Sequence, residues 1–302
     1  MSAWAHVPGR FAGFLAALTP APEETHAAAA AAHRAGALLS RRFAEPGVPT
    51  CVNEPVLIGA FAKGTALGGD RTVDLAVPLP TPDVIAANDV ASVLAARFGA
   101  VEMSPEGWLT VGDPRDRSAM QVRILPVLKT RDGRYRFGGS APGGWPAVIH
   151  PHAEIIAIDR LDRATAGKAR DLLRLLKAWK RLRNVPINTI ALERLTGVFL
   201  AVWLYRRRSL LFYDWMIRDF FFWMTAQTGQ SLAIPGTGDF VAVGEAWLAE
   251  AWDAHAAAAR AADRERDNDR DGALSDWQSI FGRGFGTCRP VQPLPHRRRA
   301  SS

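Results

Sequence analysis

Hydrophobic and polar positions divide the chain into segments of different character. Residues 23–43 are rich in alanine and follow the segment TPAPEE, which supplies a proline and acidic residues for the first turn of a helix. Short runs of β-type residues then alternate with Gly, Pro and Asp, in the order VDLAVPL, AVEMS, GWLTVG and MQVRILPVL. The pattern predicts a long helix over 23–43, these strands, and a helix near 84–98 between the first two strands. From Pro151 onward it predicts a mainly helical region.

One helix of this second region, KARDLLRLLKAWKRLRN, combines a packing stripe with a basic face. Apolar residues at helical spacing predict that the following side chains are buried: Leu172, Leu175, Leu176, Trp179 and Leu182. Arg174, Lys177 and Arg181 recur on another face of the same helix. A face of this kind is most often solvated, and the functional alternative is a basic wall that faces phosphates.

These elements predict an α+β fold in two lobes. The first lobe, residues 1–150, holds the N-terminal helix and a mixed α/β core, and the second, residues 151–288, is helical. The long N-terminal helix is expected to lie along both lobes. The segment 289–302, RPVQPLPHRRRASS, has too many Pro and Arg residues to pack and predicts a disordered basic tail.

The charge of the chain favours a polyanionic partner. The sequence has 302 residues and a formal net charge of +7, with a pI near 10.0. Nucleotide phosphates, nucleic acid and an acidic protein surface all fit this charge. Only two cysteines, Cys51 and Cys288, are present, which is typical of a reducing compartment. No segment has the pattern of a signal peptide or a membrane span, so we expect a cytoplasmic protein.

The segment GAFAKGT, residues 59–65, has the composition of a phosphate-binding turn. Gly59 and Gly64 permit a tight backbone, while Lys63 and Thr65 add a charge and a hydroxyl group. A strand, TVDLAV, follows this turn. Alternate residues of a strand share a face, so positions 72 and 74 lie about 7 Å apart on one side. Two carboxylates there, with a third from a neighbouring strand, would suit divalent cations, but only Asp74 is acidic.

The order of these motifs resembles a known family. The segments GAFAKGTAL, TVDLAVPLP, VRILPVL, LLRLLKAWKRLRN, INTIALERLTGVFLAVW and DWQSIFGRGF follow the layout of the bacterial cGAS/DncV-like nucleotidyltransferases (CD-NTases, SMODS family), which are similar to oligoadenylate synthases. The resemblance implies a polymerase-beta-like nucleotidyltransferase lobe followed by a helical lobe. Members of this family join nucleoside triphosphates into cyclic di- or oligonucleotides, usually as signals in antiphage defence.

The family uses a Gly-Ser turn, an Asp-x-Asp strand and a third acid before a Leu/Val-Pro pair to bind two Mg²⁺ ions. This chain keeps the glycine as Gly59 but has Ala60 in place of the serine. It has Thr72 at the first acidic position, Asp74 at the second and Arg123 at the third. In this register a guanidinium lies where the metals would be, pairs with Asp74 and repels Mg²⁺. The resemblance therefore implies a catalytic site that has degenerated.

Further residues enter through the same resemblance or as substitutes. Lys177 matches a helical-lobe lysine that approaches nucleotide phosphates, and Glu193 matches a helix motif for which we expect a structural role. The resemblance implies a nucleotide-binding set of Gly59, Ala60, Lys63, Gly64, Thr65 and Lys177. Asp70 has the same strand parity as Asp74, but the turn GGDR places it about 13 Å away, too far for one metal pair, and Glu102 is another acid that could stand in.

Two loop features stay open as weaker candidates. His150 and His152 can form a metal pair, but they have no acidic or cysteine companion nearby in the sequence, which favours a structural role. Trp145, in PGGWPAV, is a loop aromatic that would stack on a base if it lay beside a cleft.

The first functional hypothesis is a pseudoenzyme that binds a nucleotide, a cyclic oligonucleotide, nucleic acid or a defence-system protein in a basic cleft, without a cofactor. The second is an active synthase of cyclic oligonucleotides that uses Mg²⁺ or Mn²⁺ with nucleoside triphosphates, with Asp74 as its metal ligand. The third is an interaction subunit without a ligand. Metal binding at Asp74 separates the first two, and phosphate binding separates the first from the third.

Overall fold

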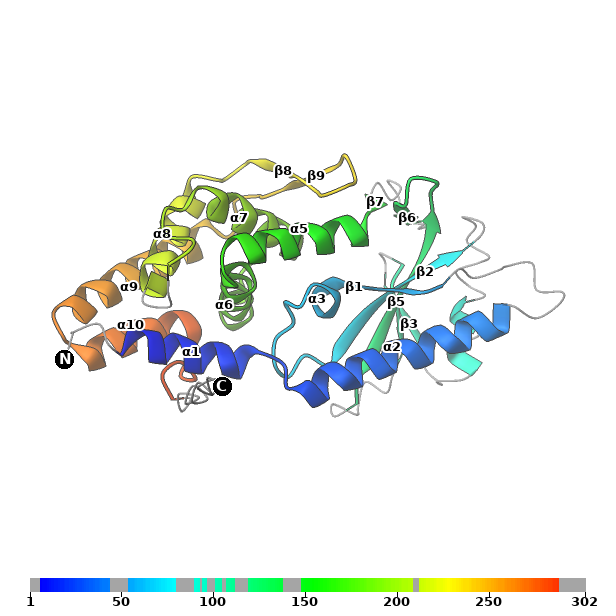
Figure 1. Ribbon diagram of the computed structural model, residues 1–302, viewed down its shortest axis with the longest axis horizontal. Coiled ribbons are helices and arrows are strands. Elements are labelled where there is room, and N and C mark those ends of the chain that lie inside the picture. The colour runs from blue at the N-terminus through cyan, green and yellow to red at the C-terminus, as the bar shows by residue number, and fades with distance from the viewer. Residues whose placement is uncertain are drawn as a thin grey trace, which may run out of the picture.

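The computed structural model describes residues 6–43, 54–79, 90–92, 94–96, 101–104, 107–111, 119–137, 148–208 and 212–287. A lobe built on a β-sheet and a helical lobe follow each other along the long axis of the molecule (Figure 1). The arrangement confirms the predicted α+β fold. None of the described helices is both long enough and apolar enough to cross a bilayer.

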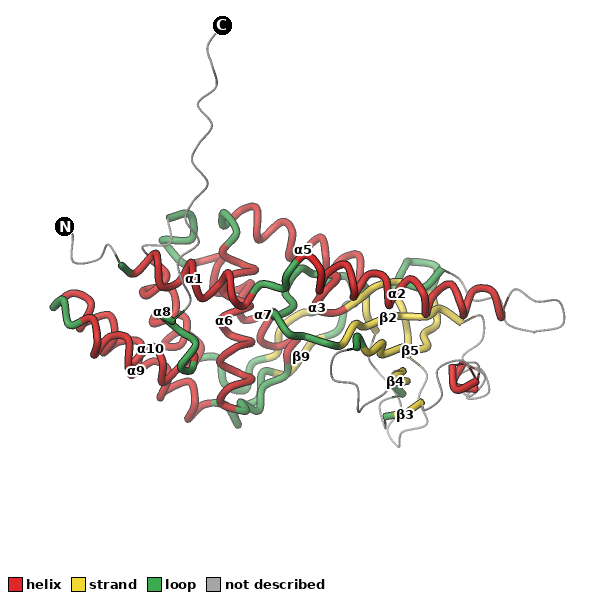
Figure 2. The backbone as a smooth tube through the Cα atoms, turned by 90° about the horizontal axis from the view of Figure 1, so that it is seen from below, coloured by secondary structure: helices red, strands yellow, loops and turns green. Residues whose placement is uncertain are grey.

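The N-terminal helical run extends along both lobes, as predicted, but it consists of two helices. The predicted helix is present as α2 (Pro22–Phe43), and α1 (Val7–Leu18), which the sequence pattern did not indicate, precedes it. The break falls at Thr19, whose backbone is extended, ahead of two prolines that end and restart the helix. Phe11 of α1 is buried in the helical lobe, whereas Ala28 of α2 is buried against the sheet (Figure 2).

The sheet contains β1 (Val56–Ile58), β2 (Thr72–Leu79), β3 (Val101–Met103), β4 (Leu109–Val111), β5 (Gln121–Lys129), β6 (Tyr135–Phe137) and β7 (Val148–Ile149). The strand order is β1-β2-β5-β4-β3, with β6 paired to the second half of β5 and β7 paired to β6. The central pair, β2 and β5, is parallel and the other pairs are antiparallel. The four strands predicted from the sequence are confirmed as β2, β3, β4 and β5.

Side-chain alternation on the central strands separates a packed face from a functional face. Val73, Leu75 and Val77 of β2 are buried against α2. Asp74 and Ala76 therefore point to the other side of the sheet. Ala76 is buried on that side with Leu125 and Val127. Asp74, two residues earlier on β2, lies where this second face opens toward the helical lobe. The sheet thus presents its acidic position to the junction between the lobes.

The helical lobe contains α5 (Pro151–Ala164), α6 (Lys168–Arg183), α7 (Thr189–Val202), α8 (Tyr213–Thr225), α9 (Leu248–Arg266) and α10 (Arg270–Phe281). A short hairpin of β8 (Ser231–Ala233) and β9 (Phe240–Ala242) interrupts the helices, and the sequence pattern did not predict it. The predicted stripe on α6 is buried except at Leu182, which is 51% exposed. That prediction was wrong because Leu182 lies in the last turn of α6, where the packed core ends.

The division of the chain at residue 150 stays a prediction. The largest apolar core gathers residues from α1 and from the helices of the second lobe, so the first helix belongs by packing to the helical lobe. Residues 90–92 and 94–96 are helical, and the rest of the helix predicted near 84–98 lies outside the described residues. The predicted tail, 289–302, also lies outside them.

Candidate functional site

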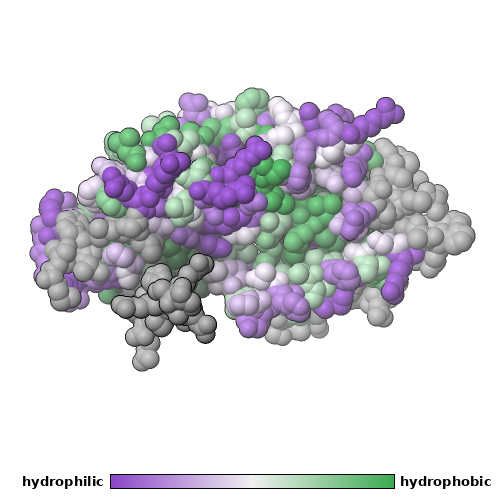
Figure 3. Space-filling model, viewed as in Figure 1, coloured by the Kyte–Doolittle hydropathy of each residue, from purple (hydrophilic) through white to green (hydrophobic). Residues whose placement is uncertain are grey.

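A cleft of about 1670 Å³ lies between the two lobes. Its described walls come from β1, the short helix α3 (Gly59–Ala62), β2 and β5 on one side, and from α5, α6, α7 and the β8–β9 hairpin on the other. Figure 3 shows apolar surface at the junction of the lobes, with hydrophilic surface on either side. The cleft is larger than the 300–1,000 Å³ usual for a drug-sized ligand.

Gly59 places the phosphate-type turn directly against Asp74. Its φ is +72°, a region that side chains other than glycine rarely adopt. A Cβ atom added at Gly59 would also clash with the Oδ2 atom of Asp74. Glycine is therefore required here for its backbone conformation and for its close approach to Asp74. It lets the start of α3 lie against the acidic strand. Ala60 follows it and also lines the cleft.

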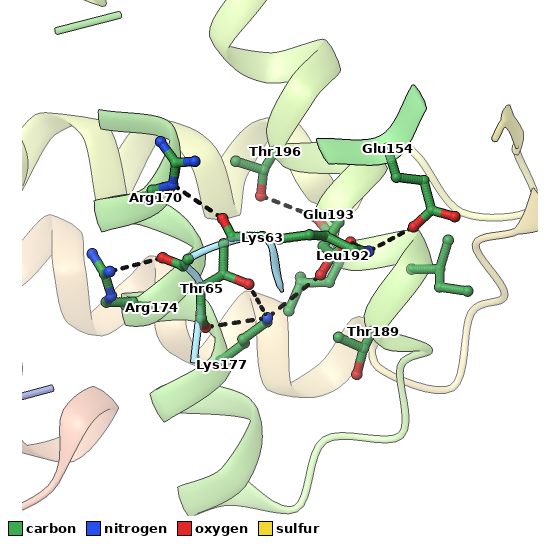
Figure 4. A network of polar contacts seen from close by, with 12 residues as sticks. Lys63, Thr65, Glu154, Arg170, Arg174, Lys177, Thr189, Leu192, Glu193 and Thr196 are labelled. Atoms are coloured by element: carbon green, nitrogen blue, oxygen red, sulfur yellow. Dashed lines mark hydrogen bonds and ion pairs between the residues drawn. The ribbon is translucent and has the colours of Figure 1, made fainter. Parts of the chain in front are cut away.

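Lys63, at the end of this turn, is buried and paired with two carboxylates. Its Nζ lies 2.6 Å from Glu193 Oε2 and 2.8 Å from Glu154 Oε2 (Figure 4). Burial alone would lower the pKa of Lys63, but the attraction of Glu193 and Glu154 outweighs it and raises the pKa above the usual lysine range. The two carboxylates thus neutralise the charge of Lys63, and this lysine does not present a free cation to a phosphate.

Lys177 of α6 belongs to the same network. Its Nζ donates to Thr65 Oγ1 at 2.7 Å and lies 3.4 Å from Glu193 Oε1. Burial lowers the pKa of Lys177, and Lys63 adds to that effect. Burial raises the pKa of Glu193, yet the two lysines reverse the shift and hold it below the usual range. The structural role expected for Glu193 has a specific form: it lies between two lysines, and Glu154 completes a balanced set of two positive and two negative charges.

Two arginines of α6 hold the backbone of the turn. Arg170 Nε donates to the carbonyl of Lys63 at 3.0 Å, and Arg174 Nη2 donates to the carbonyl of Gly64 at 2.8 Å. Lys177 and Arg181, the other two cations of the predicted face, line the cleft, and Arg181 is 59% exposed and pairs with Asp70, so a basic wall that faces phosphates stays a prediction. Gly64 and the fully buried Thr65 do not line the cleft.

Asp74 and Arg123 form the ion pair that the register of the sequence predicts. They are directly opposite each other on the parallel strands β2 and β5. Arg123 Nε and Nη2 each lie 2.7 Å from Asp74 Oδ1. The guanidinium also lies over the ring of Trp108, with its central carbon 4.8 Å from the ring centroid. Asp74 and Trp108 thus fix the guanidinium from two directions.

The donor set around Asp74 does not fit a pair of divalent cations. Burial raises the pKa of Asp74, with Arg123, Lys63 and Lys177 acting in the opposite direction. Its neighbour on the same face of β2 is the hydroxyl of Thr72, and the facing residue on β5 is a cation. Mg²⁺ requires several oxygen ligands in octahedral geometry. In the described part of the chain, no three His, Cys, Asp or Glu side chains gather closely enough to hold a metal ion.

The two substitute acids do not repair this site. Asp70 accepts from the backbone N–H of Leu67 at 2.7 Å and pairs with Arg181, so it closes the loop before β2. Glu102 shares a row of the sheet with Asp74, through Thr110 and Arg123. That row places it three strand spacings away, about 14 Å. Neither acid can share a cation with Asp74 in this arrangement.

The weaker candidates from the sequence are the histidine pair and the loop tryptophan. His150 caps α5, because its Nδ1 accepts from the backbone N–H of Ala153 at 3.3 Å. This supports the structural role for the histidine pair, and exposed His152 has no described ligand companion. Trp145 lies outside the described residues.

Charges of both signs line the cleft. Among the described residues, six lysines or arginines and five aspartates or glutamates line it, so their formal charges nearly cancel. Among the described residues that line the cleft, Lys180 is the cation without a carboxylate partner, and its Nζ donates to Thr189 Oγ1 at 3.0 Å. The sequence did not single out Glu154, Trp108 or Lys180, because their roles depend on partners that are distant in sequence.

No protein-family model matches the chain, and no curated protein matches it in sequence. Solved structures do match it in fold. The CdnC protein of Escherichia coli MS115-1 aligns with a TM-score of 0.68 in its complex with HORMA-deltaN, at 19% identity over 92% of this chain and 97% of that one. The same CdnC with ATP aligns with a TM-score of 0.69, at 18% identity over 92% of this chain and 98% of that chain.

The Vibrio cholerae DncV cyclic AMP-GMP synthase, in complex with the linear intermediate pppA(3′,5′)pG, also matches in fold. It aligns with a TM-score of 0.62, at 10% identity over 93% of this chain and 89% of that chain. These alignments extend over both lobes. The chain therefore has the fold of the bacterial cGAS/DncV-like nucleotidyltransferases.

Proposed function

We propose that the protein is a nucleotidyltransferase-fold pseudoenzyme that binds a nucleotide or a cyclic oligonucleotide in the cleft between its lobes, without a divalent metal. The pairing of Arg123 with Asp74 carries this proposal, since it places a positive charge at the position where two cations would have to bind. The cleft retains a size suited to a nucleotide-class ligand.

The solved structures of similar fold support the class of ligand. CdnC was solved with ATP, and DncV with a linear dinucleotide intermediate. CdnC was also solved with a HORMA protein, which supports our proposal of a defence-system protein as a further partner. A role in antiphage defence and a cytoplasmic location remain part of this proposal. The alternative, an active synthase, requires further metal ligands in addition to Asp74.

We expect nucleotide binding to persist in a chelator and to depend on Lys180. Binding of ATP, GTP, CTP and UTP is measured by titration calorimetry in EDTA and again in Mg²⁺, and the same dissociation constant is expected in both. Because Lys180 has no carboxylate partner, Lys180→Gln should weaken binding by about tenfold through the loss of a charged hydrogen bond.

Lys129→Gln, at an exposed position on β5, serves as the matched control and should leave affinity unchanged. Binding that occurs only with Mg²⁺ would contradict the metal-independent proposal. Absence of binding for all four nucleotides would favour an interaction subunit without a nucleotide ligand.

A further inference from the structure

Phe240, at the start of β9, is an aromatic side chain in an unusual position. It is 66% exposed and it lines the cleft. Among the described residues, it is the only large hydrophobic side chain that is both exposed and part of the cleft lining. Single exposed apolar side chains are common on protein surfaces, so the observation that matters is the place of Phe240 in the cleft, where its ring is open to a ligand.

The hairpin holds Phe240 in a fixed orientation. Val241, the next residue, packs against the core of the helical lobe. Because strand side chains alternate, Phe240 must point away from that core. Phe240 lies opposite Ala233 of β8, and the backbone N–H of Ile234 donates to the carbonyl of Asp239 at 2.9 Å, which closes the hairpin.

Both lobes brace this hairpin. Arg134, in the turn between β5 and β6, donates from Nη1 to the carbonyl of Thr237 at 2.9 Å. Gly236 has a φ of +76° and lies so close to Ala153 of α5 that an added Cβ would be 2.6 Å from the Ala153 Cβ. The hairpin is therefore clamped between the sheet lobe and α5, and it extends beyond the helices toward β7 (Figure 1).

The sheet lobe lines the same cleft with a second planar surface. Trp108 and the Arg123 guanidinium stack on each other there. Phe240 has no ring partner among the described aromatic side chains, although aromatic rings pair throughout the helical core. Guanidinium and aromatic faces are the surfaces on which nucleobases stack.

We propose that Phe240 is a nucleobase-stacking residue of the cleft. This inference rests on the proposed function, because it requires a ligand with a base. The ring of Phe240 covers one face of the base, and purines, which have the larger face, should bind more tightly than pyrimidines. The ring of Phe240 contributes to binding of the base alone and makes no contact with the phosphates.

The test compares a ligand that has a base with one that lacks it. For ATP, Phe240→Ala should raise the dissociation constant about 5- to 150-fold, the range for the loss of one base–aromatic stack. For inorganic tripolyphosphate it should leave the dissociation constant unchanged. Phe240→Trp should restore ATP binding. Phe222→Ala, at a residue of α8 that is 57% exposed and does not line the cleft, is the matched control and should bind ATP as the wild type does.

Equal ATP affinity in the wild type and in Phe240→Ala would overturn this inference alone. Equal weakening of ATP and tripolyphosphate would also overturn it, since that result reports a disturbed cleft and not a lost stack. A wild-type protein that binds none of the four ribonucleoside triphosphates would overturn the proposed function and this inference together. Phe240 is exposed, so its replacement should change stability by less than about 0.5 kcal/mol.

Discussion

Glu193→Ala is expected to lower the free energy of unfolding by about 3–5 kcal/mol, the usual cost of removing one partner from a buried ion pair. Glu193 faces both Lys63 and Lys177, and the side chains of all three are no more than 14% exposed. Without Glu193, no carboxylate of a described residue stays in ion-pair distance of Lys177, and Lys63 keeps Glu154. Unfolding in urea, followed by tryptophan fluorescence, measures the change.

Asp263→Ala is the matched control, because Asp263 forms an exposed pair with Arg266 on α9. Exposed pairs contribute about 0.2–1 kcal/mol, so this variant should be almost as stable as the wild type. A loss of less than about 1 kcal/mol in Glu193→Ala would contradict the buried network and would leave Lys63 and Lys177 free to bind phosphate.

The same network makes the stability of the folded protein depend on pH, and the pKa of Glu193 gives the direction. The pKa of Glu193 is lower in the folded protein than in the unfolded chain. Its contribution is therefore fully present above the unfolded pKa and is lost as the pH falls through the folded pKa. Glu193→Gln should show a weaker loss of stability on acidification than the wild type.

The second large effect is a gain of metal binding in the double variant Thr72→Asp/Arg123→Asp. Residues 72 and 74 share one face of β2, and residue 123 lies opposite residue 74 on β5. The variant would place two further carboxylates within about 7 Å of Asp74, on the same face, and would remove the repelling guanidinium. We expect Mn²⁺ to bind at least about tenfold more tightly, a gain of about 1.4 kcal/mol or more.

Titration calorimetry with Mn²⁺ measures this gain. Thr287→Asp/Arg208→Asp makes the same change of charge at exposed positions outside the cleft lining and should not bind Mn²⁺ more tightly. If the two double variants bind Mn²⁺ alike, the assignment of Thr72 and Arg123 to the acidic positions is wrong.

The local parts of this account could be predicted from the sequence. Alternation along β2 gives the face of Asp74, the family resemblance implied that Arg123 lies beside it, and the ion pair follows from their opposite charges. The spacing on α6 gives a basic face, but it cannot identify what lies opposite that face. Its arginines contact the backbone of Lys63 and Gly64, more than 100 residues away.

The ion pairs that neutralise the cleft lysines could not be predicted either, because they join residues that are distant in sequence. Lys63 reads as a phosphate ligand beside Gly64 in the sequence, and only the packing of α5 and α7 against the turn brings Glu154 and Glu193 to it. Phe240 gave no signal either. Its hairpin strands have three residues each, which is too short for an alternation pattern to emerge.

The most direct test of the degenerate site is a search for product. The purified protein is incubated with all four ribonucleoside triphosphates and Mg²⁺ or Mn²⁺, with and without nucleic acid, and the products are resolved by mass spectrometry. The account predicts no new phosphodiester-linked product, and wild type and Asp74→Ala should give the same result. A 2′–5′ or 3′–5′ linked oligonucleotide that Asp74→Ala abolishes would contradict it and would show that Asp74 serves a working catalytic site.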